Sequence, residues 1–272
     1  MNRIALSVAI LFCATSVTYI GCKKDDVADT ETTSSTDNSL CEGEFMRVLP
    51  TVNKISIDEP GVHRWGPGGP GVQSCPTVTV STPNQFPLTM TLDYGAAGCA
   101  DPVDGKVRKG RMIIGMDRPW DSVGCVMTVM LDSFFVGAIH FEGTTTITRT
   151  ATDAFTMVLN DGHCSKSGSA PWDIDWNTNK TVRWTSGVGN SSASQVIEIT
   201  GTNSGVDRNG QAFTANITSP IVRDMDCTWI TKGTVVLTPD GKAERTIDFG
   251  NGTCDNRGTI MIEGNTFEFT MQ

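Results

Sequence analysis

The chain has 272 residues and a formal net charge of −9 at pH 7, from 21 Lys and Arg residues against 30 Asp and Glu residues. The basic residues form no patch that would attract a phosphate backbone, so we expect no nucleic-acid partner. The length is sufficient for a sizeable hydrophobic core within a single all-β domain.

The first 21 residues have the composition of a secretory signal peptide. Arg3 supplies a positive charge, residues 4–20 are mostly apolar, and Gly21 is a small residue directly before Cys22. The apolar run is too short for a membrane span and no stop-transfer pattern follows it. Residues 1–21 are therefore predicted to be a signal peptide, with a short buried helix as the alternative.

The junction at Cys22 resembles a bacterial lipobox, in which the cysteine is lipidated and becomes the new N-terminus. Tyr19 departs from the aliphatic residue that is usual three positions before that cysteine. Residues 23–26 read KKDD and resemble the export tag of surface lipoproteins, although a solvated linker is an equal alternative. The resemblance implies a lipoprotein of the bacterial outer membrane, on the cell surface or on the periplasmic face.

Residues 27–44 are mostly Thr, Ser, Asp, Asn and Glu. A segment with so few apolar residues cannot bury enough surface to fold by itself. We therefore expect residues 22–44 to be a lipidated N-terminus and a flexible tether, and residues 45–272 to be a single β domain.

Secretion would place the remaining cysteines in an oxidising compartment. Cys13 leaves with the signal peptide and Cys22 carries the lipid, so an odd number of cysteines remains. At least one of them therefore lacks an intramolecular disulfide partner. The seven residues are Cys41, Cys75, Cys99, Cys125, Cys164, Cys227 and Cys254.

Apolar residues that alternate with threonine predict a series of strands. The segments are 77–81, 88–94, 126–131, 144–150, 154–160, 196–202, 212–218, 233–238 and 266–271. Turn pairs such as Asn209-Gly210 and Asp240-Gly241 separate them, and long helical patterns are absent. The sequence therefore predicts an all-β fold, an antiparallel meander that forms a sandwich or a partial barrel.

One hairpin pattern occurs twice, over residues 75–115 and 227–264. TLDYGAAGC at 91–99 and TIDFGNGTC at 246–254 place Asp, Gly and Cys at the same spacing. Each copy has another cysteine before its hairpin, and counting outward from the turn places the two cysteines of each copy opposite each other. The pattern predicts two hairpins that are closed by the disulfides Cys75–Cys99 and Cys227–Cys254.

The repeated aspartates, Asp93 and Asp248, allow two interpretations. They could be the paired carboxylates of an active site. An Asp just before a glycine turn more often accepts hydrogen bonds from the N–H groups of its own turn, and we favour this second role.

The ordered motifs CPTVTVS, TLDYG, DGKVRKGRMII, GTNSGVDRNGQAF and CTWITKGTVVLTPDGKAERTIDFGNGTCDNRGTIMI are similar to those of a group of uncharacterised lipoproteins from the Bacteroidota. The similarity covers most of residues 75–271. It implies a surface or periplasmic lipoprotein of β structure and carries no activity or substrate. Cys125 and Cys164 are additional to this pattern, and the pairing of Cys41, Cys125 and Cys164 stays open.

Motifs of catalysis or metal binding are weak. The three histidines, His63, His140 and His163, lie in unrelated contexts, and no nucleophile elbow or phosphate-binding loop is present. His163 adjoins Cys164, which could indicate a metal or thiol site but is more typical of a turn that carries a disulfide. We expect no catalytic residue and no cofactor.

One segment of alternating polar residues resembles the start of a calcium loop. Its residues are Asp173, Asp175, Asn177 and Asn179. The sixth position of the loop would be Thr178 instead of glycine, and the twelfth would be Trp184 instead of a bidentate Glu. The same alternation fits a strand with its polar side chains outward, which we favour.

The sequence leaves the ligand open. Residues 63–71, rich in glycine and proline, could be a recognition loop that exposes Trp65 or a linker, and Trp120, Trp172, Trp176, Trp184 and Trp229 could stack on sugars or fill the core. We expect a lipid-anchored, non-catalytic binding or structural module with a glycan or an envelope protein as its partner. The alternative is a secreted enzyme that acts on glycans, which would need two carboxylates about 5–10 Å apart.

Overall fold

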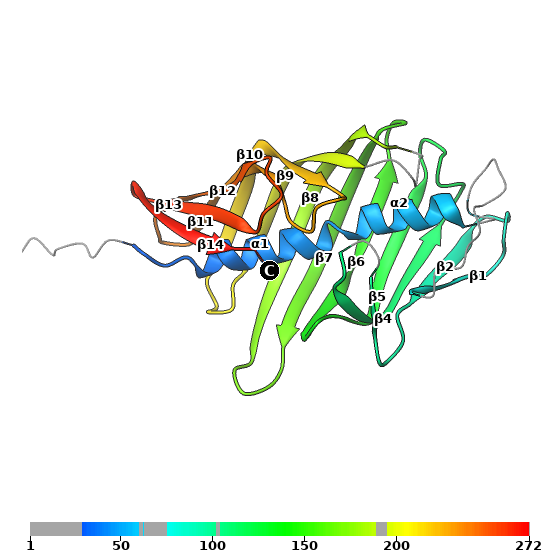
Figure 1. Ribbon diagram of the computed structural model, residues 1–272, viewed down its shortest axis with the longest axis horizontal. Helices are drawn as coiled ribbons and strands as arrows, with labels where there is room; N and C mark the ends of the chain where they lie inside the picture. Colours follow the sequence, from blue (N-terminus) through cyan, green and yellow to red (C-terminus); the bar gives the residue numbers. More distant parts are fainter. Residues whose placement is uncertain (1–28, 60–61, 63–74, 102–103, 189–194, 272) are drawn as a thin grey trace, which may run out of the picture.

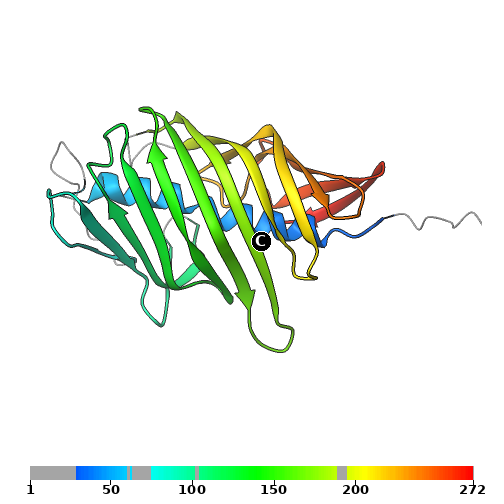
Figure 2. The same ribbon diagram turned by 180° about the vertical axis from the view of Figure 1, so that it is seen from behind.

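The computed structural model describes residues 29–59, 62, 75–101, 104–188 and 195–271, and these form one antiparallel sheet with two helices on one face (Figures 1 and 2). Consecutive strands pair with each other along the order β1-β2-β4 to β14, while β3 pairs with β4 beside this path. The sheet is not closed into a barrel. The predicted all-β antiparallel meander is confirmed.

The strands are long in the middle of the sheet and short at its ends. Their bounds are β1 Thr77–Val80, β2 Leu88–Asp93, β3 Cys99–Ala100, β4 Val107–Met116, β5 Val126–Val136, β6 Ile139–Arg149, β7 Ala154–Lys166, β8 Trp172–Ser186, β9 Val196–Val206, β10 Ala212–Asp224, β11 Lys232–Pro239, β12 Arg245–Asn251, β13 Arg257–Ile262 and β14 Asn265–Thr270.

Helices α1 (Thr33–Phe45) and α2 (Val48–Asp58) follow one another across the sheet. Figure 1 shows them in front of the strands, and Figure 2 shows the sheet from its other side. We call the face that carries the helices the inner face and the opposite face the outer face. No helix among the described residues is long and apolar enough to span a membrane.

Helix α1 shows that the predicted flexible tether is wrong for residues 33–44. Most of its side chains are buried, including Ser34, Asp37, Asn38 and Glu42, although they are polar. Burial of such groups is tolerated only where each finds a partner, and the inner face supplies those partners. Residues 22–28 of the predicted tether and the predicted signal peptide lie outside the described residues.

Helix α2 packs on the sheet through an apolar face. Val48, Leu49, Val52 and Ile55 follow helical spacing and are all buried. Below both helices, alternate side chains of every long strand point inward and form the core. The innermost apolar residues include Met90, Ile114, Met127, Ile147, Met157, Ile174, Ile199, Val235, Ile247 and Ile260.

The repeated hairpins have the predicted disulfides. Cys75 is bonded to Cys99 and Cys227 to Cys254, with Cα atoms 6.0 and 5.7 Å apart. These are the two pairs that the repeated spacing indicates.

Each repeated aspartate closes its own turn. The Gly95 N–H donates to Asp93 Oδ1 at 2.7 Å, and the Gly250 N–H donates to Asp248 Oδ1 at 2.8 Å. Both glycines have positive φ, 70° and 103°, a conformation that other residues resist. These hydrogen bonds agree with the structural interpretation of Asp93 and Asp248.

Candidate functional site

The outer face is built from the residues that the strands turn away from the helices. Threonine suits these positions because its branched side chain packs well on a pleated surface and its hydroxyl stays in solvent. In the middle of the sheet the cross-strand partners are Asn179 with Thr202, Ser204 with Thr214, and Thr214 with Thr238. The strand register therefore joins polar residues that are far apart in the sequence into continuous rows.

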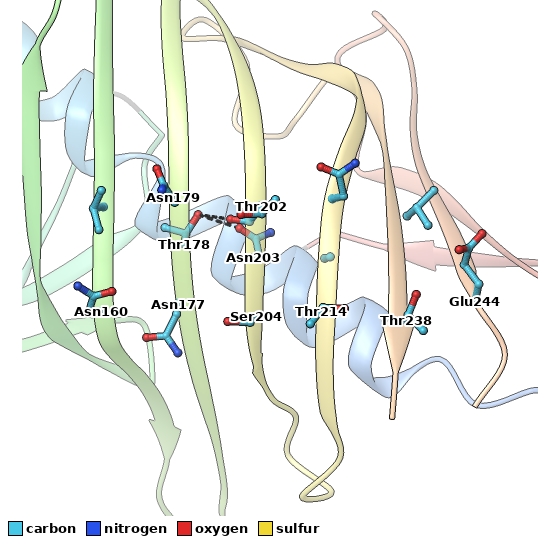
Figure 3. Close-up of a pocket in the computed structure, with 14 residues that line it drawn as sticks. Asn160, Asn177, Thr178, Asn179, Thr202, Asn203, Ser204, Thr214, Thr238 and Glu244 are labelled. Atoms are coloured by element: carbon cyan, nitrogen blue, oxygen red, sulfur yellow. Dashed lines mark hydrogen bonds between the residues drawn. The ribbon is translucent and has the colours of Figure 1, made fainter. Parts of the chain in front are cut away.

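These rows line a groove of about 700 Å³ on the outer face, which we call the outer groove. Figure 3 shows its side chains in front of the sheet and the helix behind it. Five strands, β7 to β11, contribute to the lining, and Glu244 adds a carboxylate at one side. The exposed polar residues of the lining are Asn160, Asn179, Thr202, Ser204, Thr214, Asn216, Thr238 and Glu244.

The floor of the outer groove is fixed from the inner face. The Thr178 hydroxyl lies 2.8 Å from Asn203 Oδ1 and 3.1 Å from the Thr202 carbonyl oxygen. Asn203 Nδ2 donates to Glu42 Oε2 at 2.6 Å and to Asn38 Oδ1 at 3.0 Å. Helix α1 thus holds β8 and β9 in place below the groove.

Gly201 allows β8 and β9 to approach closely at the same place. Its φ is 126°, and a Cβ at this position would lie 2.2 Å from the Asn179 carbonyl oxygen. Any larger residue would push the two strands apart and shift Asn179 and Thr202, whose side chains line the groove.

A second hollow, of about 560 Å³, continues from the outer groove and shares Asn177, Ser204 and Thr214 with it. Its lining includes three carboxylates, Asp161, Asp175 and Asp240. The Asp161 N–H donates to Asn177 Oδ1 at 2.7 Å, which joins the two hollows through one side chain. The outer face therefore offers a groove lined mainly by uncharged polar residues, with an acidic end.

His163 lies beside this acidic end, but His163 and His140 contact different carboxylates. His163 Nδ1 is 2.8 Å from Asp175 Oδ1, and His140 Nδ1 is 3.5 Å from Glu142 Oε2. No group of three or more His, Cys, Asp or Glu side chains in the described part of the chain could hold a metal ion. His63 and Cys22 lie outside the described residues.

The four residues of the suggested calcium loop lie on β8. Asp173, Asp175 and Asn179 are exposed and Asn177 is half-buried, and all four alternate with buried residues. Alternate residues of a strand are roughly 6.6 Å apart, so their side chains project side by side and do not converge on one ion. The structure supports the strand interpretation of this segment and not the calcium loop.

None of the described tryptophans lines the outer groove. Trp120, Trp176 and Trp184 are buried, so the sugar-stacking alternative is wrong for these three. Trp172 is half-buried and lies under the Arg208 guanidinium, whose Cζ is 4.4 Å from the ring centroid. Trp229 is half-buried against the core, and Trp65 lies outside the described residues.

Two cationic side chains next to α1 form ion pairs with it. Lys180 Nζ lies 3.1 Å from Glu42 Oε2, and neither side chain is exposed. Arg208 Nε lies 2.8 Å from Asp37 Oδ1. Burial lowers the pKa of Lys180, and the adjacent Glu42 carboxylate opposes that shift. The part of the inner face beneath α1 is therefore a packed interface, whereas the outer groove is open.

No family model, curated protein or solved structure matches the chain. Thr202, Ser204, Thr214 and Thr238 were not singled out in the sequence, although the three strands that carry them, β9, β10 and β11, were predicted. The alternation of these polar residues with apolar ones is visible in the sequence. The strand register that places them side by side is not.

Proposed function

We propose that this protein is a lipid-anchored module of the bacterial cell envelope that binds a neutral, hydroxyl-rich chain, a glycan, in the outer groove. The observation that carries the proposal is the row of amide and hydroxyl side chains contributed by adjacent strands. Glu244 is the one carboxylate among the described residues of the lining.

The groove chemistry is complementary to sugar hydroxyls. An Asn side chain both donates and accepts hydrogen bonds, and so does the hydroxyl of Ser or Thr. Each sugar hydroxyl has the same dual character. Val158, Val236 and the threonine methyl groups supply the apolar contacts that the C–H faces of a sugar need. Because no aromatic side chain among the described residues lines the groove, we expect affinity to build up over several sugar units.

The anchor follows from the Gly21-Cys22 junction. If Cys22 carries lipid, residues 23–32 separate it from the start of α1 and can span at most about 35 Å. The sheet would then lie close to the membrane. We expect Cys22→Ala to release the protein from the membrane fraction or to leave the signal uncleaved. A variant that fractionates and migrates like the wild type contradicts lipidation.

The membrane face is tested separately. The KKDD segment at residues 23–26 supports the outer cell surface, where protease added to intact cells should digest the domain. Protection of the domain would instead support the periplasmic face. Replacement of the four residues by Ala should move a surface protein inward and leave a periplasmic one unchanged.

The glycan proposal is tested with isosteric variants of the full chain. Thr214→Val and Thr238→Val remove two groove hydroxyls but keep the shape and branching of the side chains. We expect the double variant to lose at least about tenfold in glycan affinity, which is roughly 1.4 kcal/mol. The matched control is Thr146→Val, an exposed outer-face residue outside the groove lining. Equal binding by all variants contradicts the proposal.

One observation favours a second function, hydrolysis of the bound glycan. Asp161, Asp175 and Asp240 line the acidic end next to the groove, and a glycosidase needs two carboxylates across its substrate. Incubation of bound oligosaccharides followed by product analysis distinguishes the two functions. Shortened products that disappear in Asp175→Asn would establish the enzyme, and intact oligosaccharides would establish the binding module.

A further inference from the structure

Two of the cysteines outside the repeated hairpins face each other inside the protein. Cys41 lies on α1 and Cys164 on β7, and their Sγ atoms are 3.5 Å apart. Neither residue has any exposed surface. The other described cysteines are the four of the two disulfides and Cys125.

The contact between these two thiols is enforced by the groups around them. On the same helix, Asn38 accepts a hydrogen bond from Trp176 Nε1 at 3.0 Å, and Glu42 lies 3.1 Å from Lys180 Nζ. These contacts fix the rotation of α1 about its axis and its position over the sheet, and they thereby fix the position of Cys41. On the sheet, Cys164 is held between its register partners on β6 and β8.

We propose that Cys41 and Cys164 form a third disulfide bond, which ties α1 covalently to the middle of the sheet. A disulfide needs its sulfur atoms about 2.05 Å apart, so the two must approach by roughly 1.5 Å. The two disulfides of the hairpins show a chain suited to an oxidising compartment.

The reaction is a thiol–disulfide exchange. One cysteine thiolate attacks the disulfide of an oxidant, such as an envelope thiol oxidase or oxidised glutathione, and forms a mixed disulfide. The second thiolate then displaces the oxidant. Cys41 and Cys164 together lose two electrons and two protons, and the oxidant disulfide gains them and becomes two thiols.

Burial determines when this bond forms. Burial raises the pKa of the Cys41 thiol well above the ordinary value of a cysteine, and the thiolate is the reactive species. An oxidant also has no access to either sulfur once α1 is docked. The disulfide bond therefore forms during folding, while α1 still detaches from the sheet and docks again. Stable docking of α1 then protects the disulfide from reductants.

Cys125 is the cysteine that remains unpaired in this scheme. It is buried, and its Sγ donates to the Arg118 carbonyl oxygen at 3.4 Å. The seven cysteines that follow Cys22 then divide into three disulfides and one thiol, which accounts for the odd number.

The direct test is a peptide map of the full chain, isolated without reductant from cells that export it. The protein is unfolded in acid, alkylated with iodoacetamide in denaturant and cleaved with trypsin. Cleavage after Lys24 and Arg47 releases Cys41, and cleavage after Arg149 and Lys166 releases Cys164, each as the single cysteine of its peptide. We expect a linked peptide of 25–47 with 150–166 and an alkylated Cys125. Alkylation of Cys41 and Cys164, or a link from either to Cys125, overturns the proposal.

A second test uses the difference in exposure between the disulfides. Cys254 is exposed, whereas Cys41 and Cys164 are fully buried. Increasing concentrations of reductant added to the native protein should reduce Cys227–Cys254 first. The disulfide that links peptides 25–47 and 150–166 should remain at those concentrations. Loss of the Cys41–Cys164 link before the exposed one contradicts the protected bond.

Single substitutions supply the controls. Cys164→Ser should make Cys41 fully alkylated in the unfolded chain and leave both hairpin disulfides unchanged. Cys125→Ser should retain the linked peptide. If Cys164→Ser does not accumulate, the wild-type map and the Cys125→Ser map still decide the question.

Discussion

The two faces of β8 and β9 use neighbouring residues of the same strands for opposite purposes. Lys180 points inward, is 1% exposed and pairs with Glu42 of α1. Asn179, one residue earlier, points outward and lines the outer groove. Because side chains alternate along a strand, a shift of one residue exchanges the two faces.

The difference shows where this fold places its charges. On the inner face, the buried ammonium of Lys180 and the buried carboxylate of Glu42 pair with each other between β8 and α1. On the outer face above them, the groove is lined mainly by uncharged amides and hydroxyls. The inner charges specify where a polar helix docks, a role for which hydrophobic packing alone is poorly selective. The amide and hydroxyl side chains of the outer groove remain available to bind a ligand.

The largest expected effect comes from breaking the inner face. Lys180→Met leaves the Glu42 carboxylate buried without its cation, which should lower the free energy of unfolding by about 3–5 kcal/mol in urea denaturation. The double variant Glu42→Gln with Lys180→Met should recover most of the loss. The outward control Asn179→Ala should stay within about 0.5 kcal/mol. A loss below about 1 kcal/mol in Lys180→Met would contradict the role of the pair.

The hairpin disulfides come next, because they hold the ends of the sheet where strands are short. They close segments whose sequence separations are 24 and 27 residues. Replacing both cysteines of either pair with Ser should lower stability by about 2–5 kcal/mol, measured by thermal and urea unfolding. A non-reducing peptide map that links Cys75 to Cys254 would contradict the hairpin assignment.

The fold was predictable where local pattern and tertiary environment agree. Alternation in 154–160 and 212–218 predicted β7 and β10, because one side of each strand packs on the core. The equal spacing of Asp93 to Cys99 and of Asp248 to Cys254 predicted the corners, because turn, glycine and disulfide all act locally. Strand β4 was not predicted, since its first half, VRKG, contains charged residues and glycine.

Helix α1 and the outer groove depend on partners that are distant in the sequence. Nothing within TSSTDNSLCEGEF shows that Asp37 meets Arg208 or that Glu42 meets Lys180. Composition therefore predicted a tether. The groove depends on the register of five strands, and Asn160 and Thr238, which both line it, are separated by four hairpins.

A third prediction concerns pH and the inner face near the end of α1. Burial by itself would raise the pKa of Asp104, but hydrogen bonds from Arg108 outweigh it and leave that pKa below its ordinary value of 3.8. Arg108 Nη1 lies 2.7 Å from Asp104 Oδ1, and Arg47 Nε lies 3.3 Å from Oδ2. The folded protein thus binds this proton less readily than the unfolded chain.

The direction in which stability changes with pH follows from proton linkage. A lowered carboxyl pKa contributes stability that is present above about pH 3.8 and is lost as the pH falls through the folded value. Asp104→Asn should cost roughly 1–3 kcal/mol at pH 7, and its difference from the wild type should shrink as the pH falls below about 3.8. Urea unfolding at several pH values measures this. A difference that stays constant with pH would show that the Asp104 charge is not the cause.

The smallest expected effect concerns the repeated corners on the outer side of the sheet. Asp93→Asn and Asp248→Asn keep an oxygen that can accept the hydrogen bond from Gly95 or Gly250, so each should cost less than about 1 kcal/mol. Asp93→Ala and Asp248→Ala remove the acceptor and should cost more. Because each carboxylate serves its own turn, the two Asn variants should bind glycan like the wild type. Loss of binding or of glycan cleavage in either would return these aspartates to the active-site interpretation and would move the functional site away from the outer groove.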